Sequence, residues 1–248
     1  MEETGLIEKL LLFGLGRQEA VIYICLLKNG ELTGYEVAKL TGISRSNVYN
    51  TLASLVEQGA AYVCEGNSTK YVAVGIEEFC DNRIRYMQEM EKLLVLNAPK
   101  QQLPTEGYVT IEGYEHIKDK IHHMILGAAQ RIYFSANETF LGKWEKEITE
   151  VLKRNVKVVL LSEKLPDNMR ELDVIFYKRL PAEEPWDQGE QQIRLIIDSA
   201  YVLTGDVVGG STDNCLYCAQ KNFVNVFKEA MSNEIKLIEI QRTSNLQA

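Results

Sequence analysis

The chain has 248 residues, of which 46% are hydrophobic and 25% are charged, a composition that excludes global disorder and suits one or two folded domains. Its net charge of -8 argues against a polybasic, histone-like nucleic-acid binder. No apolar run approaches the roughly 20 residues that a membrane span needs, and the acidic N-terminus lacks the basic start of a signal peptide. We therefore expect a cytoplasmic protein with no membrane partner.

The first 75 residues show a helical pattern that changes into a strand pattern. Apolar residues recur at helical spacing up to residue 58, and capping residues and glycines mark the helix ends. Two short runs of β-branched and aromatic residues then flank a turn, which is typical of a hairpin. The expected elements are two helices within 6–28 broken near Gly14–Gly16, helices 34–40 and 45–58 capped by Thr33 and Ser44, and hairpin strands 62–64 and 71–73.

The segment from Tyr35 to Leu52 has the spacing of a helix-turn-helix. Ala38 is small at the point where two helices would touch, Gly42 suits the turn between them, and Val48 can pack back against Ala38. The rest of the buried face is predicted to be Val37, Leu40, Ile43, Leu52 and Leu55. Together with the hairpin, this pattern predicts a winged helix-turn-helix over residues 1–75.

The second helix of this motif would present polar side chains to double-stranded DNA. Arginine, asparagine and serine suit base edges and phosphates, and the N-terminal half of such a helix enters the major groove. The hairpin, with Lys70 near its tip, would be the wing. The predicted DNA-binding residues are Ser44, Arg45, Ser46, Asn47, Tyr49, Asn50 and Lys70. A helical hairpin used only for protein contact is the alternative.

The charge of the predicted DNA-binding domain is itself negative. Residues 1–75 carry six Lys or Arg against eight Asp or Glu, a net of -2, which leaves -6 for the remainder. Binding must then rest on a few placed contacts and on dimerisation, because there is no broad basic field to attract phosphates.

Residues 76–97 are predicted to form one helix. Its approximate apolar stripe is Phe79, Ile84, Met87, Met90 and Leu94. The stripe is shorter than the three to four heptads that identify a coiled coil, so a core-facing helix and a dimerisation helix both fit. We favour dimerisation and expect a homodimer. Two prolines within 98–104 then mark a linker, so the connecting segment is residues 76–104.

From residue 105 onward, strand patterns alternate with helix patterns, which predicts an α/β domain over residues 105–248. The continuous apolar run 156–161 is typical of a strand covered on both faces. Strands are expected at 108–111, 131–135, 156–161, 174–177, 193–197, 201–204 and 216–219, and helices at 113–128, 138–154 and 222–231.

The N-terminal segment resembles the winged-helix domain of TrmB-type transcriptional regulators. The resemblance is carried by a leucine-rich first helix, by Gly14-Leu15, by Glu19-Ala20 with Tyr23 following, and by the run Ser44–Tyr49. Residues 116–162 are similar to the start of a phospholipase D-like domain, the effector fold of many TrmB relatives. The resemblance implies a dimeric transcription factor whose C-terminal domain senses a small molecule, such as a sugar or another metabolite.

An active phospholipase D-like domain needs a His-x-Lys pair followed by an Asp, because the histidine attacks phosphorus and the lysine stabilises the phosphate charge. The matching stretch, 196–206, contains neither His nor Lys, and the histidines of the chain are at 116, 122 and 123. We therefore expect no enzymatic activity, no cofactor and no metal, but an effector pocket. Its candidate residues, each with a structural alternative as helix start, turn or core residue, are Ser135, Asn137, Glu138, Trp144, Asp198 and Asp206.

Cys215 and Cys218 form a lone Cys-x-x-Cys pair. A zinc site needs two further ligands at suitable spacing, and none follows, while a redox pair would open a helix. A structural role is favoured over thiol sensing and over metal binding. The alternative to a DNA-binding regulator is a winged-helix protein-interaction module fused to an α/β domain with enzymatic or thiol-sensing activity.

Overall fold

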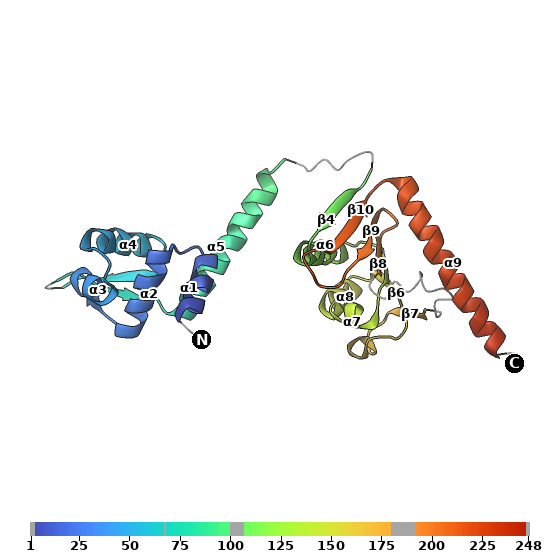
Figure 1. Cartoon of the computed structure of the whole chain (residues 1–248), viewed down its shortest axis with the longest axis horizontal. Helices are drawn as coiled ribbons and strands as arrows, with labels where there is room; N and C mark the ends of the chain where they lie inside the picture. The colour runs from blue at the N-terminus through green and yellow to red at the C-terminus, as the bar shows by residue number, and fades with distance from the viewer. Residues whose placement is uncertain (1–2, 67, 100–106, 180–191, 247–248) are drawn as a thin grey trace. The chain divides into compact units, whose positions relative to one another are not determined.

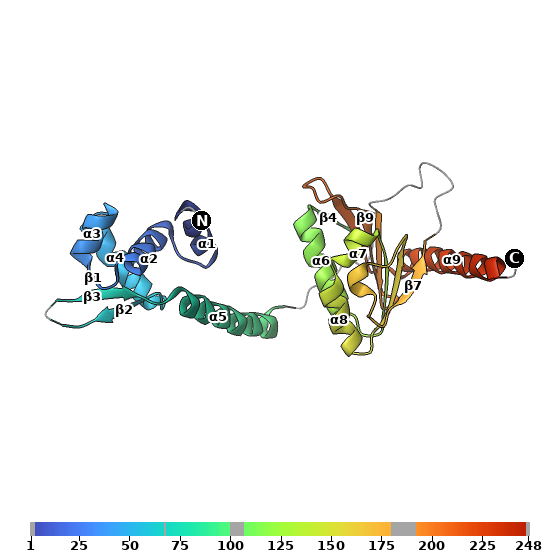
Figure 2. The ribbon, with the colours of Figure 1, turned by 90° about the horizontal axis from the view of Figure 1, so that it is seen from below.

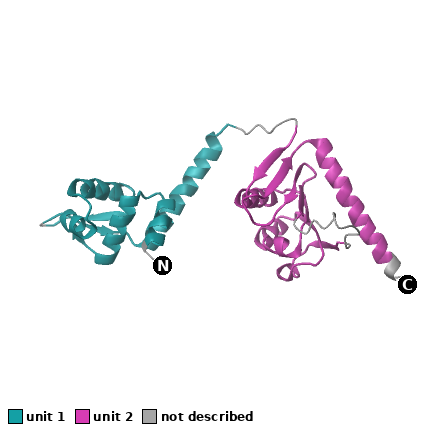
Figure 3. Ribbon diagram, in the orientation of Figure 1, with its two compact units in different colours: residues 1–100 teal, residues 101–248 magenta. Residues whose placement is uncertain are grey.

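The computed structural model divides into two compact units, Met1–Lys100 and Gln101–Ala248 (Figure 3). The described residues are 3–66, 68–99, 107–179 and 192–246. The expected linker at 98–104 lies at the boundary between the units, and its residues 100–104 fall outside the described ranges. The predicted connecting helix belongs to the first unit.

The first unit is a winged helix-turn-helix followed by a long helix, as predicted. Its elements are α1 (Glu3–Leu12), α2 (Arg17–Asn29), β1 (Leu32–Thr33), α3 (Gly34–Thr41), α4 (Arg45–Glu57), β2 (Ala61–Cys64), β3 (Lys70–Ala73) and α5 (Ile76–Asn97) (Figure 1). The three strands form one antiparallel sheet in the order β1-β3-β2. Only β1 was not predicted, because two residues are too few to show a periodic pattern.

Local capping fixes the helix-turn-helix. The Thr33 hydroxyl accepts a hydrogen bond from the Glu36 backbone N–H at 3.3 Å, and the Glu36 carboxylate accepts one from the Thr33 N–H at 2.8 Å. This reciprocal pair satisfies N–H groups that the first turn of α3 leaves without partners. Gly42 ends α3 with a φ of 71°, a conformation that favours glycine, and Ser44 caps α4 through the Asn47 N–H.

The core of the first unit collects the predicted apolar faces around Tyr23. Val37, Val48 and Leu52 are fully buried, and the Tyr23 hydroxyl donates to the carbonyl of Val74 at 2.8 Å. Burial raises the pKa of Tyr23 to about 12. The expectation that Leu40 completes this core is wrong, because Leu40 is 56% exposed on the outer side of α3.

The second unit is an α/β domain built on one mixed sheet. In the described part of the chain, its strand order is β4-β10-β9-β8-β5-β6-β7. The parallel pairs are β5–β6 and β6–β7, and the other neighbours are antiparallel. Its elements are β4 (Val109–Glu112), α6 (Tyr114–Leu126), β5 (Arg131–Ser135), α7 (Glu138–Gly142), α8 (Glu145–Lys153), β6 (Lys157–Ser162), η1 (Asp167–Met169), β7 (Ile175–Lys178), β8 (Gln192–Ile197), β9 (Tyr201–Asp206), β10 (Asn214–Cys218) and α9 (Lys221–Leu246).

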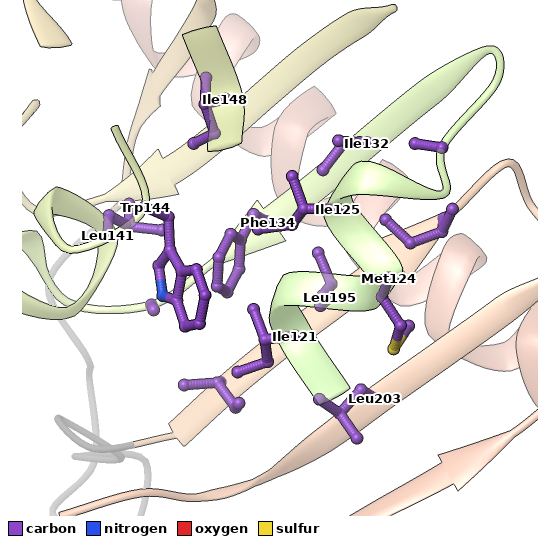
Figure 4. Packing of buried hydrophobic residues seen from close by; sticks show 14 of the residues in the cluster. Ile121, Met124, Ile125, Ile132, Phe134, Leu141, Trp144, Ile148, Leu195 and Leu203 are labelled. Carbon is purple, nitrogen blue, oxygen red and sulfur yellow. The ribbon is translucent and has the colours of Figure 1, made fainter. Parts of the chain in front are cut away.

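Helices cover both faces of this sheet (Figure 2). On one face α6, α7 and α8 pack over the larger core, in which Phe134 and Leu195 from neighbouring strands meet Ile121 and Trp144 (Figure 4). On the other face α9 packs Val224 and other apolar residues over a smaller cluster. The strands therefore bury side chains in both directions, as the run 156–161 predicted.

Two predicted helices of the second unit differ from the structure. The helix expected at 138–154 is two helices, α7 and α8, because the chain turns at Lys143 and Trp144 so that both pieces follow the sheet. The helix expected at 222–231 continues to Leu246. Its second half was missed because side chains such as Leu237 and Ile240 are exposed, so the apolar spacing that marks a core-facing helix weakens there.

Gly205 lies inside β9, where it faces the adjacent strand β10. A Cβ atom at this position would lie 2.8 Å from the Cα atom of Cys215 on the adjacent strand β10, closer than real contacts allow.

We expect Gly205→Val to lower the unfolding free energy of the second unit by about 3 kcal/mol, measured by urea titration followed by circular dichroism. Thr204→Val is a matched control on the same strand, and equal stabilities of the two variants would contradict this account.

Candidate functional site

The N-terminal half of α4 presents a polar face on a firmly packed helix. Its inner face is anchored by Val48, Thr51, Leu52 and Leu55, which are buried in the first unit. The helix cap and the outward positions of the first turns are exposed, and these are Ser44, Arg45, Ser46, Asn47, Tyr49 and Asn50. The structure thus places six of the seven predicted DNA-binding side chains together on one element, where a rigid helix can present them to a groove.

Two residues at the start of α3, Gly34 and Tyr35, contact side chains of this face. The guanidinium of Arg45 lies over the ring of Tyr35, 4.4 Å from the ring centroid. Tyr49 lies against Gly34, where a Cβ atom would approach the Tyr49 ring to 2.6 Å. Sequence reasoning missed Tyr35 and Gly34, because their contact with α4 depends on the helix crossing and not on spacing along the chain.

Lys70 lies apart from the α4 face, at the start of β3 in the wing. Its ammonium group is 3.7 Å from a carboxylate oxygen of Glu31, and both side chains are about half exposed. A surface ion pair of this kind contributes little to stability, so Lys70 can exchange Glu31 for a DNA phosphate at small cost. Ser68 and Thr69 beside it are exposed, and Asn67 lies outside the described residues.

Three of the predicted effector residues lie at the carboxyl end of β5, Ser135 as its last residue and Asn137 and Glu138 just after it. Ser135 is fully buried and accepts hydrogen bonds from two arginine side chains. Asn137 caps α7, where its side-chain oxygen accepts the Phe140 N–H at 2.8 Å. Glu138 forms an ion pair with Lys164 at 2.7 Å. Asn137 therefore acts as a helix cap, which was the structural alternative to an effector role, while Ser135 belongs to a polar cluster.

The other three predicted effector residues lie elsewhere in the second unit. Trp144 is 4% exposed and lies in the larger core, so the expectation that its ring serves as a stacking surface is corrected (Figure 4). Asp198 sits in the tight turn between β8 and β9, at the opposite end of β5 from Ser135. Asp206 ends β9, beyond the strand β8 that separates it from β5. The six residues do not form one pocket.

Asp198 has a defined structural role. Its carboxylate accepts the backbone N–H groups of Ala129, Gln130 and Arg131, each at 2.8 Å. Partial burial alone would raise its pKa, but these hydrogen bonds and the charge of Arg131 outweigh burial and hold the pKa below its ordinary value. The lowered pKa means that the ionised carboxylate stabilises the folded state.

We expect the stabilisation by Asp198 to be present at neutral pH and lost in acid. A folded-state pKa below the unfolded value of about 3.9 contributes stability above that value, and the contribution disappears as the pH falls through the folded pKa. Asp198→Asn should therefore lower the melting temperature at pH 7, and its difference from the unmodified protein should shrink below about pH 4. Asp173→Asn, at an exposed carboxylate, serves as the control in the same melting series; a pH-independent difference for Asp198→Asn would contradict the assignment.

A polar cluster under α9 joins residues that sequence reasoning missed. Arg194 on β8 pairs in register with Ser135 on β5, and Arg179 follows β7. Both guanidinium groups reach Ser135 and the carboxylate of Glu234 on α9. No local motif marks these residues, because four separate elements bring them together.

Cys215 and Cys218 cannot work as a disulfide pair in this fold. They are three residues apart on β10, so their side chains point to opposite faces of the sheet. Cys215 packs in the larger core and Cys218 in the cluster under α9. Burial raises the pKa of Cys215 to about 12, which keeps it a protonated thiol. The geometry favours the structural role.

The three histidines on α6 all make contacts, and the rings of His122 and His123 meet edge to face. His122 on α6 lies 2.9 Å from a carboxylate oxygen of Glu147 on α8, and His116 contacts the carbonyl of Glu112. Among the residues that the structure describes, no group of three or more His, Cys, Asp or Glu side chains could hold a metal ion. Within the same residues, no single helix has both the length and the apolar composition for crossing a membrane.

Comparison with known proteins gives a family match in the first unit. Residues 10–77 match the family model described as "Sugar-specific transcriptional regulator TrmB". This range runs from the end of α1 to the start of α5 and so contains the helix-turn-helix and the wing.

Similar proteins extend over more of the chain. The uncharacterized protein YrhO of Bacillus subtilis is 25% identical over 226 residues, which cover 90% of this chain and 81% of YrhO. The HTH-type sugar sensing transcriptional regulator TrmBL1 of Pyrococcus furiosus is 26% identical over 196 residues. That match covers 75% of this chain but 56% of TrmBL1, so the chain spans about half the length of this relative.

Solved structures give lower similarity. The structure of TrmBL2, an archaeal chromatin protein whose structure shows a novel mode of DNA binding, aligns with 94% of this chain and 98% of its own, with a TM-score of 0.41 and 22% identity. Nuc of Salmonella typhimurium, a phospholipase D family member, covers 52% of this chain and 94% of its own, with a TM-score of 0.41 and 12% identity. NucT of Helicobacter pylori covers 52% of this chain and 96% of its own, with a TM-score of 0.42 and 10% identity.

Proposed function

We propose that the chain is a TrmB-type transcriptional regulator, which the family match of residues 10–77 and the similarity to TrmBL1 support, and that it binds DNA as a homodimer whose affinity for its operator responds to a small-molecule effector. The observation that carries the DNA-binding site is the polar face of α4. Six exposed polar side chains lie at the N-terminal half of a helix whose opposite face is fully buried. A helix N-terminus also attracts phosphate through its unpaired N–H groups.

In the proposed complex, α4 enters the major groove and the wing follows the backbone. Arg45 and Asn50 are suited to guanine and adenine edges respectively, because each can form two parallel hydrogen bonds with its base. Ser44, Ser46 and Lys70 would contact phosphates, which fixes the register of the helix on the duplex. The negative charge of residues 1–75 then keeps non-specific binding weak.

The proposed dimer forms through α5. Phe79 is buried in the first unit and anchors the start of α5, while Ile84, Met87 and Leu94 along the rest of the helix are exposed in the single chain. Figure 1 shows that α5 extends well beyond the other elements of its unit. Pairing this stripe with that of a second copy would bury these side chains and set the distance between two α4 helices.

The second unit is proposed as a sensor and not as an enzyme. The stretch 196–206 forms the end of β8, the turn after it and the whole of β9. It contains no His or Lys, and the histidines lie on α6. Binding of a sugar or another metabolite to this unit would shift the population between arrangements that place the two α4 helices at different separations. With DNA as its partner, the protein is expected to act in the cytoplasm.

Selection of bound sequences from a random duplex library by the purified full-length protein tests this proposal. We expect enrichment of an inverted repeat whose half-site centres are about 10 base pairs apart or a multiple of that spacing, because a two-fold dimer places two helices on successive major grooves. Recovery of sequences with no shared motif would contradict specific DNA binding, and a single unrepeated half-site would contradict the dimer.

A further inference from the structure

The polar cluster under α9 has the composition of an oxyanion site. Arg179 and Arg194 converge on the buried hydroxyl of Ser135. Ser135 and Arg194 lie on the paired strands β5 and β8, and Arg179 follows β7. Guanidinium groups are planar forks that match the paired oxygens of carboxylates and phosphates. Two of them beside one hydroxyl therefore select a ligand group with several negatively charged oxygens.

Glu234 occupies this cluster with only a partial fit. One of its carboxylate oxygens is 3.5 Å from Nε of Arg179, and the other is 2.8 Å from Nη2 of Arg194. Arg194 thus receives one oxygen from Glu234 and not the two that a parallel pair would supply. In addition, the Nε–H of Arg194 is buried and has no hydrogen-bond acceptor among the described residues. A buried donor without an acceptor is costly, and an added oxyanion would satisfy it.

The position of the cluster is also that of a ligand site. Ser135 is the last residue of β5, and Arg179 comes directly after the parallel strand β7. Ligands of open α/β sheets bind outside the carboxyl ends of such strands. Arg179, Arg194 and Glu234 each keep between 20% and 24% of the side chain exposed, so the cluster is accessible from solvent while its field is only partly screened.

We propose that Arg179, Arg194 and Ser135 bind the phosphate or carboxylate group of a small-molecule effector, and that Glu234 of α9 occupies this site in its absence. Binding replaces the Glu234 carboxylate, removes an ionic contact between α9 and the sheet, and so couples the site to α9. This inference rests on the proposed effector role of the second unit and adds the chemical class of the effector.

The alternative interpretation is an ion cluster that only fastens α9 to the sheet. The ligand site and the structural ion cluster differ in the expected effect of Glu234→Gln, which keeps the side-chain shape but removes the competing charge. A ligand site then gains affinity for anions, whereas a fastening cluster only loses stability. Under either interpretation, Arg194→Met removes one guanidinium group, and Arg194→Lys keeps the positive charge without the two-pronged guanidinium geometry.

Isothermal titration calorimetry of the full-length protein, without DNA, tests the proposal with inorganic phosphate, glucose 6-phosphate, citrate and uncharged glucose as probes. We expect at least one anionic probe to bind, to bind about tenfold more tightly to Glu234→Gln, and to lose about tenfold or more in Arg194→Met and in Arg194→Lys. Arg170→Met, at an exposed arginine paired with Asp167, is the matched control and should bind like the unmodified protein.

The probes also separate the sources of the anionic group. Preference for glucose 6-phosphate over inorganic phosphate indicates a phosphorylated metabolite, and preference for citrate indicates a carboxylate. Absence of anion binding in both the unmodified protein and Glu234→Gln would overturn the proposal, as would binding that Arg194→Met and Arg194→Lys leave unchanged. Because the titration contains no DNA, failure here is distinguishable from failure of DNA binding, which is measured separately on operator duplexes.

Discussion

Replacing Arg45 and Asn50 together by alanine should abolish specific DNA binding while leaving the fold intact. Both side chains are exposed on α4, and neither contributes to the core formed by Val48, Leu52 and Leu55. A bidentate contact to the correct base is worth about 1–3 kcal/mol, and a factor of ten in affinity corresponds to about 1.4 kcal/mol. Because each protomer of the variant lacks both of these base-reading side chains, we expect the affinity for the selected operator to fall by about 100-fold or more.

Fluorescence anisotropy with labelled operator and with a scrambled duplex measures this decrease in affinity. Arg17→Ala, at an exposed arginine at the start of α2, is the control and should bind the operator normally. We also expect the double variant to bind operator and scrambled duplex equally, since the two replaced side chains are those proposed to distinguish bases. An operator affinity unchanged in the double variant would show that α4 does not read the groove and would favour the protein-interaction alternative.

Placing aspartates at Met87 and Leu94 should separate the proposed dimer and weaken operator binding with it. These side chains are 57% and 69% exposed in the single chain and lie on one stripe of α5. Burying two pairs of carboxylates in a helix interface is strongly unfavourable, because charged groups lose their hydration there. Joining two half-site contacts in one molecule raises the overall affinity by about 100-fold to 10,000-fold, so loss of the dimer should cost at least about 100-fold.

Light scattering coupled to size exclusion gives the oligomeric state, and anisotropy gives the operator affinity. Leu96→Asp is the matched control, because Leu96 lies about 180° around the helix from Met87 and is also exposed. The control should remain a dimer. A dimer that persists in Met87→Asp/Leu94→Asp would place the interface elsewhere, and a monomer that still binds the operator tightly would contradict the coupling between the two properties.

The first unit was predictable because its signals are local. Thr33 with Glu36, Gly42 and Ser44 each act within a few residues, and they fix where α3 and α4 begin and end. The main error in this unit, Leu40, arose because its spacing alone does not say which side of α3 faces α2 and α4. The exposed polar set on α4 followed from the same periodicity, and its role in binding DNA bases stays a prediction.

The second unit was predictable as an alternation of strands and helices but not as a site. Trp144, Asp198 and Asp206 were chosen as polar or aromatic residues near predicted strand ends. In the fold, Trp144 is buried in the core, and the strand order places Asp198 at the opposite end of β5 and Asp206 beyond β8. Strand order depends on pairings between distant segments, which periodicity does not record. For the same reason the sequence does not show that Arg179 and Arg194 belong to one site, because only the fold brings them beside Ser135.

The sequence by itself determined that this protein has a winged helix-turn-helix, a connecting helix and an α/β domain, because caps, turns and apolar periodicity act over short stretches of chain. The tertiary structure decided which polar groups of the second domain meet. Ser135 and Arg194 are 59 positions apart and become neighbours through the register of β5 and β8, and Glu234 reaches Arg194 because α9 packs across that face. A site assembled from separate elements is fixed by packing over long sequence distances, so only the folded chain shows it.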